Sequence, residues 1–204
     1  MNLPIEKVKD LYYKNGLSAR AVGEKLGFSV WQVIKFMKKN NLARRDQAET
    51  HHLAFLALPN SFNPKSKLTN KEKLLKTAGL MLYWGEGVKT TDRIVDITNS
   101  DSLMIKLFLK MLREIYGIKE EKLRVLLYCY ANQNVEELIN YWVKITGISQ
   151  TQFTKPYIRQ DFLEKKKSKM PYGLIHVRYN DKKLVGLIRK DTEKIIKSFA
   201  GVTE

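Results

Sequence analysis

Apolar residues recur at helical spacing in three short runs within residues 1–46. The first run follows Pro4, a residue that is tolerated in the first turn of a helix. Ser18 can cap the second run and Gly27 can end it, since glycine readily takes the left-handed backbone of a helix C-terminus. The pattern therefore predicts three short helices joined by tight turns.

The third run begins with a capping-box pattern, in which the side chains of Ser29 and Gln32 satisfy backbone groups at a helix start. Its apolar stripe is expected to face the inside of a small bundle, which leaves a basic face outside. Three short helices with a glycine-containing turn between the second and the third are typical of a helix-turn-helix. The alternative is a helical bundle whose outer lysines are merely solvated.

The stretch GLSARAVGEKLGFSVWQVIKFMKKNNLARR resembles the helix-turn-helix of resolvases and many small regulators. In that family the third helix enters the major groove of DNA. The resemblance implies that four residues reach base edges: Ser29, Trp31, Gln32 and Lys35. Gln32 could make a bidentate pair with adenine, whereas Trp31 could equally pack on the following segment. The residues implied to hold phosphates, and so to position the protein, are Lys38, Lys39, Arg44 and Arg45.

Periodicity fades in residues 47–69, where prolines and a cluster of Asn and Ser indicate a linker. Residues 52–58 are apolar and could add a short helix or a docking segment. His51 and His52 are adjacent in sequence, so they do not share a helix face as metal ligands usually do. We therefore expect neither of them to have a functional role.

Residues 70–204 alternate between helical and strand patterns. Thr69 and Glu72 form a second capping-box pattern, which opens a helix that runs toward Gly85. Strands are expected at 93–98, 123–131, 153–159 and 173–179, and further helices at 101–115, 134–146 and 184–199. The order predicts a fold of the α+β class, in which an antiparallel sheet and its helices follow the N-terminal helix-turn-helix.

Composition and charge narrow the function. Hydrophobic residues make up 44% of the 204 positions, which is enough for a packed core. The chain has 37 Lys and Arg against 21 Asp and Glu, a net charge of +16 that is spread over its whole length rather than confined to one tail. Such an excess attracts polyanions, and nucleic acid is the commonest of these. A membrane surface is the alternative, but neither a basic amphipathic helix nor a lipid signal is evident.

The sequence lacks the patterns that are typical of disulfide-rich proteins, zinc proteins and several classes of enzyme. One cysteine, Cys129, excludes a disulfide scaffold and a multi-cysteine zinc site, and its apolar surroundings indicate a core residue. No Gly-rich phosphate loop or Ser/His/Asp pattern is present. The apolar runs are short and no signal-peptide pattern begins the chain, so we expect a cytoplasmic, nucleoid-associated protein. The basic run at 164–170 is expected to be a loop that either contacts phosphates or is solvated.

The segment TAGLMLYWGEGVK resembles the LAGLIDADG signature of homing endonucleases, and VDITNSDSLMIKLFLKMLREIYGI resembles the segment after it. The likeness covers roughly residues 70–199 in the order of elements. In that family two such helices pack through small residues, and the acid at each helix end holds the magnesium ions that activate water for phosphodiester cleavage. The likeness places Glu86 at this catalytic, metal-binding acid and Gly85 at the small contact position, although Met81 and Trp84 are larger than usual.

One acid is insufficient for such a site, so the resemblance implies a homodimer that brings two copies of Glu86 together around Mg²⁺. The two sheets would then form a basic saddle over double-stranded DNA. The implied saddle residues are basic residues on or beside the expected strands: Lys89, Lys155, Arg159, His176 and Arg178.

Three functions are compatible with these patterns. The first is a sequence-specific double-stranded DNA-binding protein, for example a transcriptional regulator, since regulators of the bacterial sporulation type join a LAGLIDADG-like domain to a helix-turn-helix. The second is a Mg-dependent, site-specific DNA endonuclease that acts as a homodimer. The third, an RNA-binding or structural basic protein, explains the charge alone. The helix-turn-helix pattern favours DNA binding, and only Glu86 argues for cleavage.

Overall fold

The computed structural model describes residues 3–160 and 170–201. The chain divides into two compact units, with the boundary between Pro59 and Asn60. Each unit has an apolar core of its own. In the parts of the chain that the structure describes, every helix is too short or too polar to cross a membrane.

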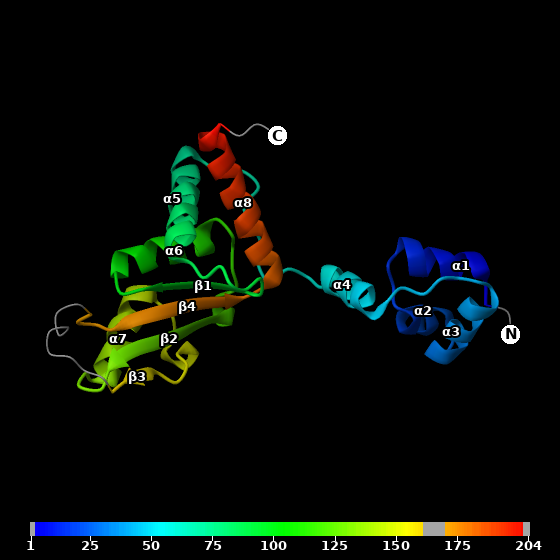
Figure 1. Ribbon diagram of the computed structural model, residues 1–204, viewed down its shortest axis with the longest axis horizontal. Coiled ribbons are helices and arrows are strands. Elements are labelled where there is room, and N and C mark those ends of the chain that lie inside the picture. Colours follow the sequence, from blue (N-terminus) through cyan, green and yellow to red (C-terminus); the bar gives the residue numbers. More distant parts are fainter. Residues whose placement is uncertain (1–2, 161–169, 202–204) are drawn as a thin grey trace. The chain divides into compact units, whose positions relative to one another are not determined.

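The N-terminal unit is helical throughout. Its elements are α1 (Ile5–Lys9), the π-helical turn η1 (Asp10–Lys14), α2 (Ala19–Leu26), α3 (Val30–Lys39) and α4 (Gln47–Ala57) (Figure 1). The predicted caps are confirmed: Ser18 accepts a hydrogen bond from an α2 backbone N–H, and Ser29 and Gln32 form the complete capping box of α3. Gly27 ends α2 in the left-handed conformation, with φ of 77°.

The turn between α2 and α3 is tightly packed. A Cβ atom at Gly23 would lie 2.4 Å from the carbonyl oxygen of Phe28, so only glycine fits at this approach. The backbone N–H of Phe28 in turn donates to the carbonyl of Gly23 at 2.9 Å. The core that the helices enclose consists of Leu3, Val8, Tyr12, Val22, Val33 and Met37. These contacts fix the direction in which α3 leaves the turn.

The segment that follows α3 is held by two tyrosines of η1. The hydroxyl of Tyr12 accepts a hydrogen bond from the backbone N–H of Arg45 at 3.0 Å. The hydroxyl of Tyr13 donates to the carbonyl of Ala43 at 2.6 Å. Asp46 then caps α4, so the chain between α3 and α4 follows a defined path.

The linker predicted for residues 47–69 contains the short helix that the sequence left as an alternative for residues 52–58. Its first part forms α4, because an aspartate cap precedes a run rich in alanine and leucine. Its second part belongs to the second unit, where Phe62 is buried and forms a β-bridge with Ile118. The hydroxyl of Ser61 also lies 2.8 Å from that of Tyr179. The Pro- and Asn-rich composition conceals these contacts, which join residues far apart in the sequence.

The second unit contains a four-stranded sheet in the order β1-β4-β2-β3. Its elements are α5 (Asn70–Glu86), β1 (Ile94–Asn99), α6 (Ser102–Glu114), η2 (Glu120–Lys122), β2 (Leu123–Tyr130), α7 (Val135–Thr146), η3 (Gln150–Gln152), β3 (Tyr157–Arg159), β4 (Leu174–Asn180) and α8 (Lys182–Ala200). The predicted α+β class is confirmed for this unit. The predicted antiparallel sheet is wrong in one pairing, because β4 is antiparallel to β1 and β2 but β2 and β3 are parallel. The crossover through α7 returns the chain in the same direction.

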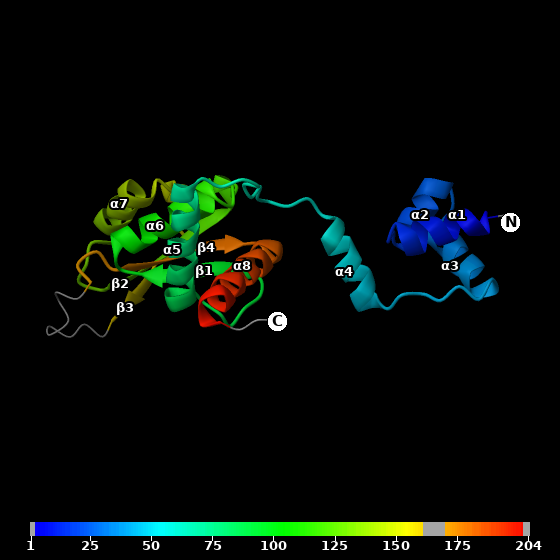
Figure 2. The same cartoon turned by 90° about the horizontal axis from the view of Figure 1, so that it is seen from above.

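The sheet is covered by helices on one face only. Figures 1 and 2 show α6 and α7 on one side of the strands, and α5 and α8 side by side at the β1 edge. Along β4, Ile175, Val177 and Tyr179 are buried in the core, while His176 and Arg178 alternate with them, as expected for a strand. We call the second face of the sheet, which no described helix covers, the open face.

Two glycines of α5 have opposite surroundings. A Cβ atom at Gly79 would lie 2.5 Å from Sδ and 2.8 Å from Cβ of Met111, so α5 and α6 approach closely there. A Cβ atom at Gly85 would meet nothing within 4 Å. Within one chain the helix-contact glycine is therefore Gly79, and Gly85 faces open space.

We expect Gly79→Ala to destabilise the second unit by roughly 1–3 kcal/mol, because the added methyl group overpacks the contact with Met111. Gly85→Ala is the matched control in the same helix, and we expect it to be neutral or stabilising by up to about 1 kcal/mol. Urea unfolding followed by tryptophan fluorescence measures both variants in a Trp31→Phe, Trp84→Phe background, in which the buried Trp142 is the one remaining tryptophan. Equal destabilisation by the two substitutions would contradict this packing.

Candidate nucleic-acid interfaces

The outer face of α3 combines one large aromatic side chain with three lysines. Trp31 is 76% exposed, and Lys35, Lys38 and Lys39 are exposed on the following turns. Residues 31, 35, 38 and 39 lie on the same side of the helix, because residues three and four apart are neighbours on a helix surface. The helix contains no acidic residue. This face, which we call the α3 face, is basic along its length and has an apolar group at its start.

Gln32 and Ser29 have a structural task in addition to the predicted contact with bases. Oε1 of Gln32 accepts a hydrogen bond from the backbone N–H of Ser29 at 2.7 Å, and Oγ of Ser29 accepts one from the backbone N–H of Gln32 at 3.3 Å. A bidentate pair with adenine requires both the oxygen and the nitrogen of the amide. The capping box therefore restricts the orientation in which Gln32 could form that pair.

Arg45 has a structural role in addition to its predicted contact with phosphates. Its guanidinium donates to the carbonyls of Gly16 at 3.1 Å and Leu17 at 2.5 Å. It also lies 4.0 Å from the centre of the Tyr12 ring. The left-handed turn at Gly16 precedes α2 and directs these carbonyls toward the arginine. Arg44, the preceding residue, is exposed.

We expect Arg45→Ala to destabilise the N-terminal unit by roughly 2–3 kcal/mol, since charge-assisted hydrogen bonds and a cation–π contact are lost together. The adjacent Arg44→Ala should leave stability within about 0.5 kcal/mol and instead reduce DNA affinity and its dependence on salt. Hydrogen exchange of peptides from residues 5–39 reports the stability of the unit, and salt titrations of binding report the second effect. A greater loss of protection in Arg44→Ala than in Arg45→Ala would contradict these assignments.

Most of the predicted saddle residues lie on or beside the open face of the sheet. The strand residues among them are Arg159 of β3 and His176 and Arg178 of β4. Lys155 is exposed two residues before β3. Lys89 lies elsewhere, beside α8, where its carbonyl accepts a hydrogen bond from Arg189 at 3.2 Å. The strand pattern therefore identifies the face for Arg159, His176 and Arg178, whereas Lys89 lies on the loop after α5.

Asp96 of β1 is absent from the residues predicted from the sequence, yet it organises the open face. It is only 6% exposed. Oδ2 accepts a hydrogen bond from Nε of Arg178 at 2.8 Å, and Oδ1 lies 3.1 Å from Nδ1 of His176. Oγ1 of Thr98 lies 2.8 Å from the same histidine nitrogen. Strand register explains the contacts, because Asp96 is opposite Arg178 and Thr98 is opposite His176.

A row of aromatic rings continues from this cluster across the sheet. The ring centre of Tyr128 on β2 lies 4.9 Å from that of His176 and 4.8 Å from that of Tyr157 on β3. Tyr157 is 54% exposed, on the edge strand. The sequence signal for these rings is the placement of tyrosines at solvent-facing positions of otherwise apolar strands.

Glu86 ends α5 and is exposed. Within residues 3–160 and 170–201, no group of three or more His, Cys, Asp or Glu side chains is placed to hold a metal ion. Mg²⁺ in proteins is bound through one or two carboxylates together with phosphate oxygens and water. A single chain supplies one of the two acids of the implied site, which stays a prediction.

Three further predictions concern residues outside these surfaces. Cys129 is buried, and burial raises the pKa of its thiol, so the predicted core position is confirmed. Nε2 of His51 lies 3.4 Å from Nε2 of Gln47 on α4. Among the described residues, His51 belongs to no group of side chains that could hold a metal ion. The basic run at 164–170 lies outside the described residues except for Met170.

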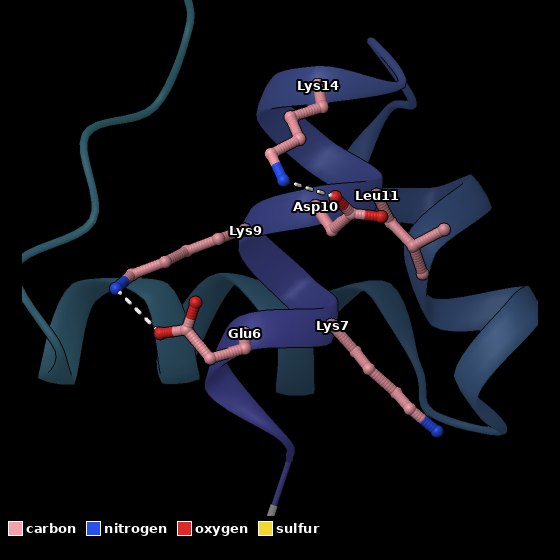
Figure 3. A pocket seen from close by; sticks show the side chains of 6 residues that line it. All are labelled: Glu6, Lys7, Lys9, Asp10, Leu11 and Lys14. Atoms are coloured by element: carbon pink, nitrogen blue, oxygen red, sulfur yellow. Dashed lines mark hydrogen bonds and ion pairs between the residues drawn. The ribbon is translucent and has the colours of Figure 1, made fainter.

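Two surface depressions of the individual units contain no additional chemical site. Figure 3 shows the one over α1 and η1, where two ion pairs form, Lys9 with Glu6 at 3.0 Å and Lys14 with Asp10 at 3.1 Å, while Lys7 is drawn without a contact to the other labelled side chains. The other lies between α5 and α8 and has a volume of about 190 Å³. That volume is below the range of ordinary ligand pockets.

Comparisons with protein-family models, with curated proteins and with solved structures found no match. The resemblance of residues 77–89 to the LAGLIDADG signature therefore stays a prediction from those residues, and the function is argued from the geometry of the two surfaces.

Proposed function

We propose that this protein binds double-stranded DNA in a sequence-specific manner through the α3 face, which enters the major groove. The observation that supports this most directly is the α3 face itself: Trp31 and three lysines on one side of a helix without acidic residues, held by a fixed turn. The net charge of +16 supports a polyanionic partner.

The dimensions of α3 suit a major groove. Ten residues span about 15 Å at 1.5 Å per residue, and the groove is about 12 Å wide and admits an α-helix. Trp31 lies at the N-terminal end of α3, which is the end that reads bases in helix-turn-helix proteins. An indole cannot form the hydrogen-bond pattern that reads guanine or adenine, but it can make apolar contact with the methyl group of thymine.

The lysines divide into two roles by position. Lys35 is one turn after Trp31, within reach of the same groove floor, and lysine is a common partner of guanine O6 and N7. Lys38 and Lys39 lie at the C-terminal end of the helix, and exposed Arg44 follows, so these three cations are placed for the phosphate backbone. Binding through them is expected to weaken steeply with salt.

A role without catalysis, such as transcriptional regulation, is favoured over cleavage because a single chain has only Glu86 at the implied catalytic position. A DNA endonuclease is the second candidate. Its support is that Glu86 is exposed at the end of α5 and that Gly85 beside it faces open space, which a second copy of α5 could enter in a homodimer.

The Trp31 contact can be tested with deoxyuridine, which lacks the methyl group of thymine. In a duplex selected from random DNA by the full chain, we expect replacement of one particular thymine by deoxyuridine to weaken binding about fourfold, as expected for one buried methyl group. Trp31→Ala should bind the two duplexes equally. Binding is measured by fluorescence anisotropy. A deoxyuridine effect of the same size in wild type and Trp31→Ala would contradict the assignment.

The endonuclease candidate is tested on the same selected duplex with Mg²⁺. If the candidate holds, wild type nicks the duplex, and Glu86→Gln loses at least about 100-fold in rate but keeps its DNA affinity, because the exposed side chain contributes little to the fold. Glu49→Gln, an exposed carboxylate on α4, is the control. Absence of cleavage by wild type excludes this candidate and leaves the DNA-binding proposal unchanged.

A further inference from the structure

The open face of the sheet differs from the α3 face in its chemistry. Its centre is the row of rings formed by Tyr157, Tyr128 and His176 on three neighbouring strands, with ring centres 4.8 and 4.9 Å apart. Tyr157 is the outermost ring and is 54% exposed. The three rings form an aromatic platform that reaches the β3 edge of the sheet.

Charge on this face is balanced at the centre. Strands β2, β3 and β4 contain no acidic residue, and the one acid of β1 is Asp96. Asp96 accepts a hydrogen bond from Arg178 and contacts His176, so the arginine beside His176 on β4 is already paired with a carboxylate. Cations farther out are Lys155 before β3 and Arg124 at the start of β2, both of which are exposed. The guanidinium of Arg124 donates to the backbone carbonyls of Glu121 and Leu123, which are uncharged acceptors.

This arrangement suits unpaired nucleotides better than a duplex. In a double helix the faces of the bases are covered by their neighbours, so an exposed ring gains little from a duplex except contact with sugar and phosphate. An unpaired base presents a flat π-face, and stacking on an aromatic side chain contributes about 1–3 kcal/mol per base. Sites for single strands combine such rings with cations that follow the backbone.

We propose that the open face binds single-stranded nucleic acid, with an unpaired base stacked on Tyr157 and the backbone held by Lys155 and Arg124. Asp96 acts as a positioning residue, because it holds His176 and Arg178 and thereby supports the inner end of the row. Stacking does not distinguish DNA from RNA, so both single strands share the chemistry that this face recognises. The proposal goes beyond the proposed function, since it concerns the second unit and a different form of nucleic acid.

The matched control comes from the same unit. Tyr172 is exposed to a similar degree, 47%, but its ring stacks at 3.8 Å on Tyr141 of α7, away from the platform. Tyr172→Ala therefore removes an exposed tyrosine without touching the proposed site. Tyr157→Phe keeps the stacking ring and loses only the hydroxyl group, so it separates stacking from hydrogen bonding.

The experiment measures fluorescence anisotropy of the full chain with labelled oligo(dT) and oligo(U) of about 12 nucleotides, and with the selected duplex. We expect Tyr157→Ala to weaken binding to at least one of the single strands about 10-fold, while Tyr157→Phe and Tyr172→Ala stay near wild type. The affinity for the duplex should be the same in all three variants. Trp31→Ala should show the reverse pattern, with weakened duplex binding and unchanged single-strand binding.

The outcomes separate this proposal from the proposed function. Failure of wild type to bind either single strand, or equal losses in Tyr157→Ala and Tyr172→Ala, overturns the platform and leaves the α3 face untouched. A loss in Tyr157→Phe as large as that in Tyr157→Ala also overturns it, because stacking is then not the source of affinity. Tyr157-dependent binding of single strands by a chain that does not bind duplex supports the platform and overturns the proposed function instead.

Discussion

In both units the elements that carry the candidate surfaces, helix α3 and the sheet, are buried on one side only, and the rest of the structure depends on this constraint. In α3, Val33 and Met37 fill the core, and the opposite side of the same helix must face water. In the second unit, α6 and α7 cover one face of the sheet, so polar side chains lie on the open face, where water satisfies the exposed ones but a buried one needs partners from the protein. Asp96 meets this requirement, because a carboxylate so little exposed is stable only when it is paired and hydrogen-bonded.

The same constraint gives the two surfaces different electrostatics. The α3 face has lysines without an acid on their helix, and such a surface attracts the phosphates of a duplex over a distance of about one Debye length. On the open face Arg178 is paired with Asp96, and the ring of Tyr157 is 54% exposed. One chain therefore presents one surface suited to phosphates and base edges and another suited to base faces, and neither role depends on how the units are arranged.

Features that arise within a few residues could be predicted from the sequence. The capping boxes of α3 and α5 each join residues three apart, and the alternation of β4 shows directly which residues face the core. Features that join distant residues could not. Asp96 and Arg178 are 82 residues apart, and Arg45 contacts a carbonyl 29 residues before it. The role of Asp96 follows only from strand register, and that of Arg45 only from a turn in another element. The sequence therefore identifies the basic residues but not their partners.

The central claim is that the α3 face lies against duplex DNA. Hydroxyl-radical footprinting of the full chain tests it most directly, because the three tryptophans differ in exposure: Trp31 is 76% exposed, Trp84 is 53% exposed and Trp142 is buried. With saturating selected duplex, the account predicts strong protection of Trp31 from oxidation, little change at Trp84, and low reactivity of Trp142 with or without DNA. An unchanged oxidation rate of Trp31 in the bound protein would contradict the account.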